Sequence, residues 1–177
     1  MDRIKVQDDF FLDEFIDPFT YFHESDNGMS LIDEQLFNIA QQLRDCYEKP
    51  ISINNWWPRY KEMEGILRTS EIVSIIENGG YHIWSGYRSH RCNIGSKHSA
   101  HRLGQAIDPK GDEKAFLQIV KDNTCDFYTM GLRRLEDIRI TPGWLHMDTL
   151  DKNTEYLKIR IVDLTSHVWD IIVKDYV

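Results

Sequence analysis

The chain has few of the features that would assign it to several large classes of protein. It contains only 3 cysteines in 177 residues, Cys46, Cys92 and Cys125, and their wide spacing argues against a disulfide-stabilised scaffold. No run of about 18 apolar residues is present, so a membrane-spanning helix is not expected. Basic residues are outnumbered, with 21 Lys and Arg against 29 Asp and Glu and a net charge of -8. Without a basic excess, binding to nucleic-acid phosphates is not expected either.

The first residues also lack an export signal. Residues 1–9 are acidic and contain no apolar core of the kind that a secretory signal peptide needs. We therefore expect synthesis in the cytoplasm, with any action outside the cell following lysis or delivery in a particle. Low-complexity segments and internal repeats are absent, and a hydrophobic content of 41% suits a soluble protein with one core.

Residues 1–30 are acidic but rich in aromatic side chains. The aromatic residues of this segment are Phe10, Phe11, Phe15, Phe19, Tyr21 and Phe22. Disordered segments are poor in such residues because they do not bury enough apolar surface to fold. We therefore predict a packed N-terminal arm over residues 1–30 and a single domain over residues 31–177.

The spacing of apolar residues predicts a mixed α+β domain. Helical spacing and breakers predict helices over 30–50, from about 62 or 70 to 77, and from 111 to about 120. Strands are predicted over 51–57, 81–85, 105–108, 137–140, 143–149 and 156–164. Residues 86–103, rich in Gly, Ser, His and Arg, are predicted to form a functional loop. The expected architecture is a small, mostly antiparallel sheet with helices packed on one side.

The segment 144–148 combines polar and apolar residues with the period of a strand. In a strand, residues two apart share a face. Trp144, His146 and Asp148 are therefore expected on one face, while Leu145 and Met147 face the core.

The segment 104–108 has the same alternation. Gly104, Ala106 and Asp108 share one face, and Ile107 lies on the other. The two small residues allow backbone or a ligand to approach closely. His101 stands just before this strand, where a loop could carry its ring over Asp108.

His101, Asp108 and His146 together supply two imidazoles and one carboxylate, a ligand set that suits Zn²⁺. Three protein ligands leave a fourth position for water, which is the pattern of catalytic rather than structural zinc. Zinc in such a site acidifies water and polarises a carbonyl group, as in metallopeptidases. Asp148 is not needed as a ligand and is expected to orient an imidazole or a backbone amide.

These residues resemble the zinc D-alanyl-D-alanine carboxypeptidase family, which includes phage L-alanyl-D-glutamate endolysins and is related in structure to the hedgehog signalling domain. The family pattern Ser-x-His-x-x-Gly-x-Ala-x-Asp is complete in residues 99–108, and the later His-x-Asp is present in residues 144–148. A Ser-Gly-Tyr-Arg segment stands upstream at residues 85–88. Residues 54–56 and 91–96 resemble the corresponding segments in a branch of this family that is common in phage genomes. The resemblance covers roughly residues 30–150.

The resemblance implies a hedgehog-like fold and a zinc peptidase that cleaves the peptide stems of peptidoglycan. His101, Asp108 and His146 would be the zinc ligands, and Arg88 would hold a substrate carbonyl or a terminal carboxylate. An arginine beside a metal also suits carboxylate recognition because its planar fork binds two oxygens; a structural salt bridge is the alternative for Arg88.

Further site residues are expected next to these motifs. Tyr87 and Trp144 are expected to contact the substrate, and Ser99 to lie beside the metal ligands.

The sequence departs from the family where a general base is expected. Many members carry a catalytic Glu three residues before the second histidine, but this chain has Gly143 there. Hydrolysis needs a base for water and an acid for the leaving amine. We expect Glu136 to take this role if a hairpin returns it toward the metal, with His98 as the second candidate. A solvated surface acid and an exposed loop histidine are the alternatives.

The same loop contains residues that allow other arrangements. His90, Cys92, His98 and His101 could form a separate structural zinc site, although their spacing matches no compact zinc finger. Cys92 beside a histidine could serve as a nucleophile.

Two functions are favoured at this stage, ahead of a third, a hedgehog-like module whose metal site serves protein recognition. The first is a phage-encoded zinc peptidase acting on cell-wall stem peptides, either as a carboxypeptidase or as an endopeptidase. The second is a non-catalytic virion or tail protein that keeps the metal for stability or wall binding, with phage structural proteins as partners. Neither function requires a nucleic acid or a membrane.

Overall fold

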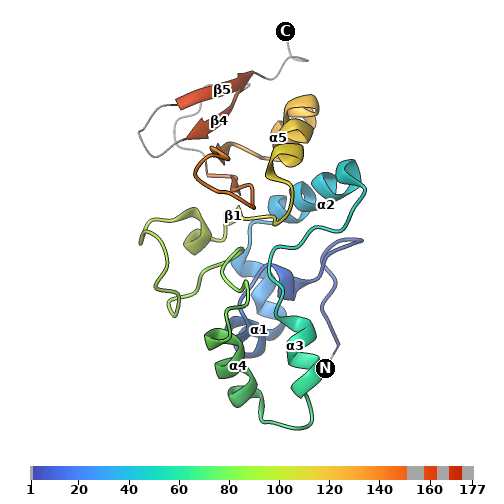
Figure 1. The fold of residues 1–177 in the computed structure, drawn as a ribbon, viewed down its shortest axis with the longest axis vertical. Coiled ribbons are helices and arrows are strands. Elements are labelled where there is room, and N and C mark those ends of the chain that lie inside the picture. The colour runs from blue at the N-terminus through green and yellow to red at the C-terminus, as the bar shows by residue number, and fades with distance from the viewer. Residues whose placement is uncertain (1, 151–157, 163–167, 173–177) are drawn as a thin grey trace.

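The computed structural model describes residues 2–150, 158–162 and 168–172, and it has the predicted α+β architecture (Figure 1). The helical elements are short and precede or flank the strands. They are η1 (Leu12–Glu14), α1 (Pro18–Glu24), η2 (Ser25–Leu31), α2 (Gln35–Tyr47), α3 (Trp57–Met63), α4 (Thr69–Asn78), η3 (Ala100–Leu103), α5 (Glu113–Asp122) and α6 (Thr124–Thr129).

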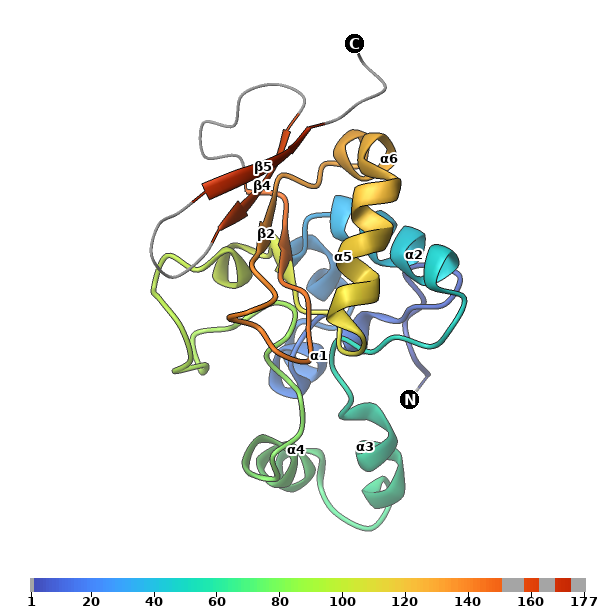
Figure 2. The same ribbon diagram turned by 45° about the horizontal axis from the view of Figure 1, so that its top comes forward.

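The strands form one sheet in the order β1-β3-β2-β4-β5. They are β1 (Ala106–Ile107), β2 (Arg134–Glu136), β3 (Met147–Asp148), β4 (Lys158–Val162) and β5 (Val168–Ile172). Only the β2–β4 pair is parallel, so the prediction of a mostly antiparallel sheet is confirmed. Figure 2 shows α5 and α6 on one side of β2, while the segment 86–103 lies on the other side.

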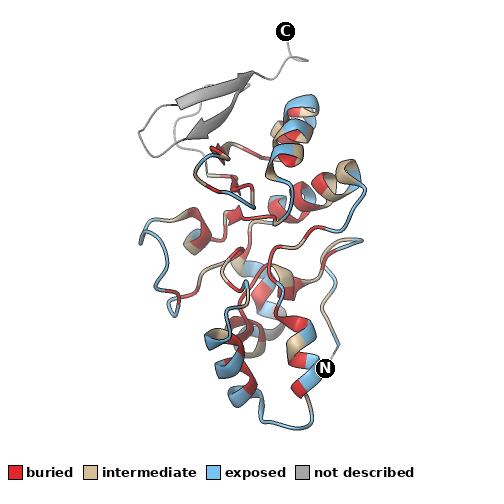
Figure 3. Ribbon diagram, viewed as in Figure 1, coloured by how far each residue is buried: buried red, intermediate tan, exposed pale blue. Residues whose placement is uncertain are grey.

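The N-terminal segment contributes to the same core as the helices and the sheet. Phe10, Phe15 and Tyr21 are at most 2% exposed and belong to the main hydrophobic cluster. The ring of Phe15 meets that of Phe37 edge-on at 4.8 Å, and Tyr21 meets Trp56 at 5.5 Å. Figure 3 shows the buried residues in red along the inward faces of the helices. Burial of these rings anchors the first thirty residues to the rest of the chain.

Three predicted helices are present with shifted ends. The helix predicted over 30–50 is α2, but residues 25–31 form the 3-10 helix η2 before it. The second predicted helix is α4, which ends at Gly79 as expected. The third is α5, which begins where the Asp112 side chain accepts a hydrogen bond from the amide of Ala115. The short helices α1 and α6 had no periodic signal long enough to predict them.

Five of the predicted strands are wrong or shortened, and the one over 105–108 is reduced to β1. Residues 51–57 are not a strand, because Trp57 begins α3 and Pro58 occupies its first turn, where a missing N–H has no consequence. Residues 81–85 form no strand, and residues 84 and 85 lie in a bend. The strand predicted over 143–149 is reduced to β3.

The strand predicted over 137–140 is a turn, and the strand of this region is β2 just before it. The Asp137 carboxylate accepts a hydrogen bond from the amide of Arg139 at 2.8 Å, and the Asp137 carbonyl accepts one from Ile140 at 2.9 Å. An aspartate that bonds the backbone in this way favours a turn over a strand.

Within the residues predicted as a strand over 156–164, β4 occupies 158–162 and the others lie outside the described residues. Across the described segments, no helix combines the length and apolar character needed to cross a membrane. All three cysteines are free.

Candidate metal centre

The sheet places Asp108 and His146 opposite one another. β1 and β3 are antiparallel, with Ala106 paired to Asp148 and Ile107 to Met147, and the next pair in this register is Asp108 with His146. The predicted alternation is confirmed, because Ile107, Met147 and Leu145 are fully buried in the hydrophobic core. Asp108 and His146 are each 5% exposed on the other face.

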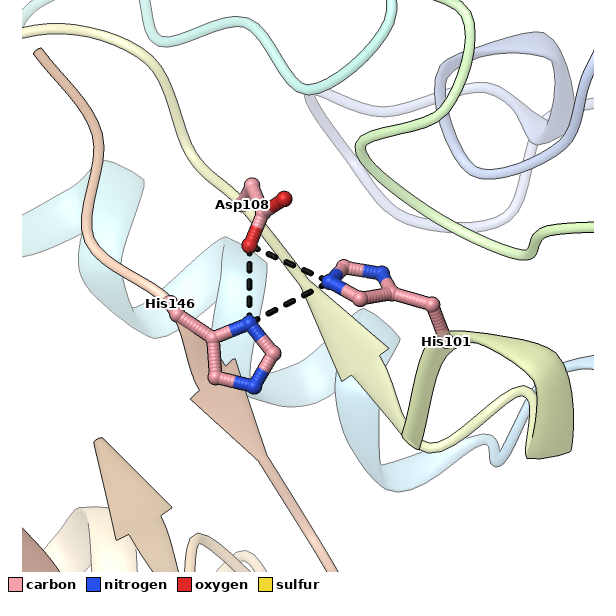
Figure 4. Close-up of side chains that lie close together, drawn as sticks. All are labelled: His101, Asp108 and His146. Carbon is pink, nitrogen blue, oxygen red and sulfur yellow. Dashed lines mark hydrogen bonds and ion pairs between the residues drawn. The ribbon is translucent and has the colours of Figure 1, made fainter. Parts of the chain in front are cut away.

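His101 reaches this pair from the short helix η3, which directly precedes β1 (Figure 4). Its Nε2 atom lies 3.2 Å from Asp108 Oδ1 and 3.2 Å from His146 Nδ1. His146 Nδ1 lies 2.9 Å from the same oxygen. Three atoms from three separate segments therefore form a small triangle.

Hydrogen bonds on the far side of each imidazole determine which nitrogen carries the proton. His101 Nδ1 lies 2.8 Å from the carbonyl oxygen of Gly86, and a carbonyl only accepts, so this nitrogen is the donor. His146 Nε2 lies 3.0 Å from the Asp148 carboxylate, which is likewise an acceptor. When both rings are neutral, His101 Nε2 and His146 Nδ1 present bare lone pairs to Asp108 Oδ1.

Three converging lone pairs need a positive charge between them. Burial raises the pKa of Asp108, but the two histidines outweigh this and hold it well below the usual range. Burial lowers the pKa of His146, but hydrogen bonds to Asp108 and Asp148 outweigh it and raise the pKa to about 10. Burial lowers the pKa of His101. Without a cation, the cluster therefore holds one proton on His146, which a bound metal would replace.

The geometry of the triangle fits a tetrahedral ion. Ligand atoms at about 2.0–2.1 Å from a tetrahedral zinc are separated from each other by about 3.3 Å. The three observed separations are 3.2, 3.2 and 2.9 Å. The buried group His101, Asp108 and His146 could therefore hold a metal ion with little rearrangement.

Asp148 orients His146 and is itself held by Arg134. The Asp148 carboxylate is fully buried, and one of its oxygens accepts the His146 Nε2–H and a hydrogen bond from Arg134 Nε at 2.7 Å. The hydrogen bond to His146 Nε2 is the contact that the predicted orienting role of Asp148 requires. Arg134 was missed because the strand was predicted three residues too late; its position two residues before Glu136 on β2 would have placed both on one face.

The Gly86 carbonyl that orients His101 is positioned by the N-terminal segment. A Cβ atom at Gly86 would lie 2.0 Å from the Phe15 carbonyl oxygen, and the Tyr87 amide donates to that same oxygen at 2.7 Å. The Asn54 side chain bridges the Ile16 carbonyl and the Ser85 amide. Only glycine, which has no Cβ atom, allows residue 86 to lie this close to the Phe15 carbonyl.

The ligand atoms border an open pocket of about 410 Å³. Among the predicted site residues, its walls include the three ligands together with Arg88, His98, Ser99, Glu136 and Trp144. Glu136 is next to His146 across the sheet, since its amide donates to the His146 carbonyl at 3.2 Å. Both candidate bases, Glu136 and His98, therefore border the same cavity as the triangle.

Arg88 contacts a metal ligand, whereas Tyr87 is placed differently. Arg88 Nη2 lies 3.3 Å from Asp108 Oδ2, and its Nε donates to the Trp84 carbonyl at 2.7 Å. Tyr87 packs against the hydrophobic core and does not line the pocket. Asp108 thus offers Oδ1 to the triangle while Arg88 holds Oδ2.

The alternative zinc site on the 86–103 loop does not form. In the part of the chain that the structure describes, the triangle is the only group of three metal-binding side chains with converging ligand atoms. His101 belongs to it, while His90 and His98 are exposed. Cys92 is buried, with its sulfur beside the backbone of Ile94.

Three comparisons were made with known proteins. Neither protein families, nor curated proteins, nor solved structures gave a match to this chain. Its functional interpretation therefore depends on the chemistry of the pocket and on the sequence motifs.

Proposed function

We propose that this protein is a zinc-dependent peptidase that cleaves the peptide stems of peptidoglycan. The observation that carries the proposal is the triangle of lone-pair atoms from His101, Asp108 and His146, which borders an open pocket. A structural zinc site is normally closed by four protein ligands, whereas three ligands beside a cavity suit a catalytic one. The motif resemblance supplies the fold family, hedgehog-like, and the substrate class.

Zinc is the ion that this ligand set suits best. Two imidazole nitrogens and one carboxylate oxygen are typical of zinc, whereas magnesium and calcium prefer ligand shells made of oxygen. When bound, zinc would supply a Lewis acid for the scissile carbonyl and lower the pKa of a water molecule.

The protein residues around the triangle have separable roles. Glu136 borders the pocket next to His146 and would accept the proton of the attacking water, then return it to the leaving amine. Arg88 holds Asp108 and keeps donors directed toward the cavity for a substrate oxygen. Trp144 would contact the peptide as part of the pocket wall.

Metal analysis combined with wall digestion tests this function. Purified protein loaded with zinc and dialysed is expected to keep one zinc per chain and to release soluble peptides from purified peptidoglycan. A chelator should abolish the release, and added zinc should restore it. His146→Ala should lose both zinc and activity, while His23→Ala, an exposed histidine on α1, serves as control. Full activity in excess chelator would contradict the proposal.

A non-catalytic role is the second candidate, and Gly143 is the observation behind it. The family places its Glu at this position, but Gly143 has φ +88, a conformation that a glutamate rarely adopts, and it does not line the pocket. In this role the protein would be a virion or tail component that keeps the metal for folding or wall binding.

Glu136→Gln separates the two candidates. For a peptidase, this change should lower kcat by about 100- to 10,000-fold, the usual contribution of a general base, with zinc content unchanged. The exposed Glu34→Gln is the matched control. If zinc binds but neither Glu136→Gln nor His146→Ala alters wall degradation, or if wild type shows none, the non-catalytic role is favoured.

A further inference from the structure

A second pocket adjoins the candidate metal centre and shares Asp108 with it. It has a volume of about 290 Å³ and shares Arg88, Asp108 and Trp144 with the first pocket. Its other walls are largely aromatic or aliphatic and include Tyr81, Trp84 and Ile94. Arg88, Asp108 and Trp144 therefore border both pockets and would lie beside a ligand that occupied the two together.

Lys110 places a positive charge in the wall of this second pocket. Its Nζ lies 4.3 Å from the centre of the Trp144 ring, in cation–π contact. Its backbone is pinned on both sides, since the Lys110 amide donates to the Ser52 carbonyl at 2.7 Å and the residue bridges to Trp144. The side chain is thus held at the pocket by neighbours that leave its ammonium donors available.

Lys110 differs from the other cations near the site in its lack of an acidic partner. Arg88 is paired with Asp108, and Arg134 with Asp148. Within residues 2–150, no carboxylate oxygen is recorded within 4.0 Å of Lys110 Nζ. A partly buried ammonium group on an aromatic ring, without a direct ion pair among the described residues, suits an anionic group of a ligand.

We propose that Lys110 is a specificity-determining residue that binds a carboxylate of the substrate in the pocket between Trp84 and Trp144. The inference rests on the proposed peptidase function and adds to it the polarity of the substrate. With the scissile carbonyl at the triangle, a carboxylate in the adjoining pocket would belong to a residue next to the cleaved bond. The apolar walls suit the small side chain of such a residue.

The same carboxylate chemistry could come from two places in a stem peptide. One is the α-carboxylate at the C-terminus, which a carboxypeptidase would recognise. The other is the free carboxylate of an internal D-glutamate, which an endopeptidase would recognise. Lys110 serves either, so the experiment must present them separately.

The experiment compares matched acid and amide substrates. The first pair is an N-acetylated tripeptide ending in D-alanyl-D-alanine and its C-terminal amide. The second is an L-alanyl-γ-D-glutamyl peptide, amidated at its C-terminus, with the α-carboxylate of D-glutamate free or amidated. Each is tested with zinc-loaded wild type, Lys110→Gln, Lys110→Arg and the control Lys114→Gln, an exposed lysine on α5.

Wild type is expected to prefer the acid of one pair by about 10- to 100-fold in kcat/KM, the usual worth of a hydrogen bond to a charged group. Lys110→Gln should remove this preference, mainly through KM, with a much larger effect on the acid than on the amide. Lys110→Arg should restore most of it, and Lys114→Gln should match wild type. The pair that shows the preference identifies the carboxylate as terminal or internal.

A binding measurement keeps the two proposals distinguishable. N-acetyl-D-alanine and N-acetyl-D-glutamate are titrated into each protein and followed by tryptophan fluorescence, since Trp84 and Trp144 line the pocket. Weaker binding of either acid to Lys110→Gln supports the carboxylate site even if no peptide is cleaved. If cleavage occurs but Lys110→Gln changes acids and amides equally or not at all, the inference is overturned and the peptidase function stands.

Discussion

The N-terminal segment and the candidate metal centre both bury carboxylates, but they compensate the charge differently. Asp13 is 2% exposed and receives two hydrogen bonds of 2.7 Å from Arg3, and Asp17 is fully buried against the amide and hydroxyl of Thr20. Each of these carboxylates accepts hydrogen bonds from guanidinium, amide or hydroxyl groups. At the metal centre, Oδ1 of Asp108 instead faces two imidazole nitrogens, which present lone pairs to it when both rings are neutral.

The pKa directions of the buried carboxylates also differ between the two regions. Burial raises the pKa of both Asp13 and Asp17, even though hydrogen bonds oppose it. At the metal centre, the histidines overcome burial and lower the pKa of Asp108. A buried carboxylate that faces two imidazole nitrogens is stabilised by a cation, either a proton on an imidazole or a metal ion in its place.

His146→Ala should produce the largest effect, because it removes one of three metal ligands. Zinc affinity is expected to fall by about 1,000-fold or more, beyond the 10- to 100-fold that outer hydrogen-bond partners contribute. Competition with a chromophoric chelator would measure it. Asp13→Asn is the matched control from the N-terminal cluster, and an equal loss of affinity in that variant would erase the contrast between the two regions.

Arg3→Ala should destabilise the fold without touching the metal. Truncation leaves Asp13 buried without its charged partner, and Arg3 also stacks 3.9 Å from the centre of the Phe11 ring. Since Arg3 is 30% exposed, we expect a loss of about 3 kcal/mol in unfolding free energy, at the low end for a broken buried pair. Urea unfolding would measure it, with the exposed Lys5→Ala as control. Altered zinc affinity in Arg3→Ala would contradict the separation.

Asp148→Asn tests whether orientation of His146 matters to the metal. The amide is a weaker acceptor for His146 Nε2–H and for Arg134, so the ring loses part of its orientation. Zinc affinity is expected to fall by about 10- to 100-fold, as for other partners of ligating histidines. Unchanged affinity in this variant would show that the triangle does not depend on its outer hydrogen bonds.

Glu14→Gln should have the smallest effect, confined to pH dependence. Burial raises the pKa of Glu14 from 4.5 to about 7. A carboxyl with a raised pKa binds extra protons in the folded state, so unfolding free energy should fall as the pH rises from about 4.5 to 7. We expect a fall on the order of 1–2 kcal/mol from this group.

The matched comparison for that prediction is made at two pH values. Glu14→Gln should resemble wild type at pH near ~4 and exceed it in stability near pH ~8, since the raised pKa acts only between these limits. Glu34→Gln, an exposed control, should follow wild type throughout. Parallel pH profiles for wild type and Glu14→Gln would mean that burial does not perturb this carboxyl.

The α+β class and the inward alternation of the two motif segments were predictable because they are local properties. Leu145 and Met147 point into the core through the strand period alone. The strands predicted over 51–57 and 137–140 are wrong because Pro58 and Asp137 favour other backbone conformations. Pro58 suits the first turn of a helix, and the Asp137 side chain stabilises a turn by bonding the backbone. The helix α6, only 6 residues long, was missed because it has too few turns to show a period.

By itself, the sequence determined which side chains could bind a metal: two histidines and an aspartate on segments whose alternation turns their apolar neighbours inward. Only the tertiary structure decided that His101 Nε2 and His146 Nδ1, from residues 45 apart, both point toward Asp108. The Gly86 carbonyl and the Arg134–Asp148 pair set those tautomers, and Lys110 completes the adjoining pocket. The reason is physical: strand alternation is encoded residue by residue, whereas the partner on the far side of an imidazole ring exists only once distant segments have packed together.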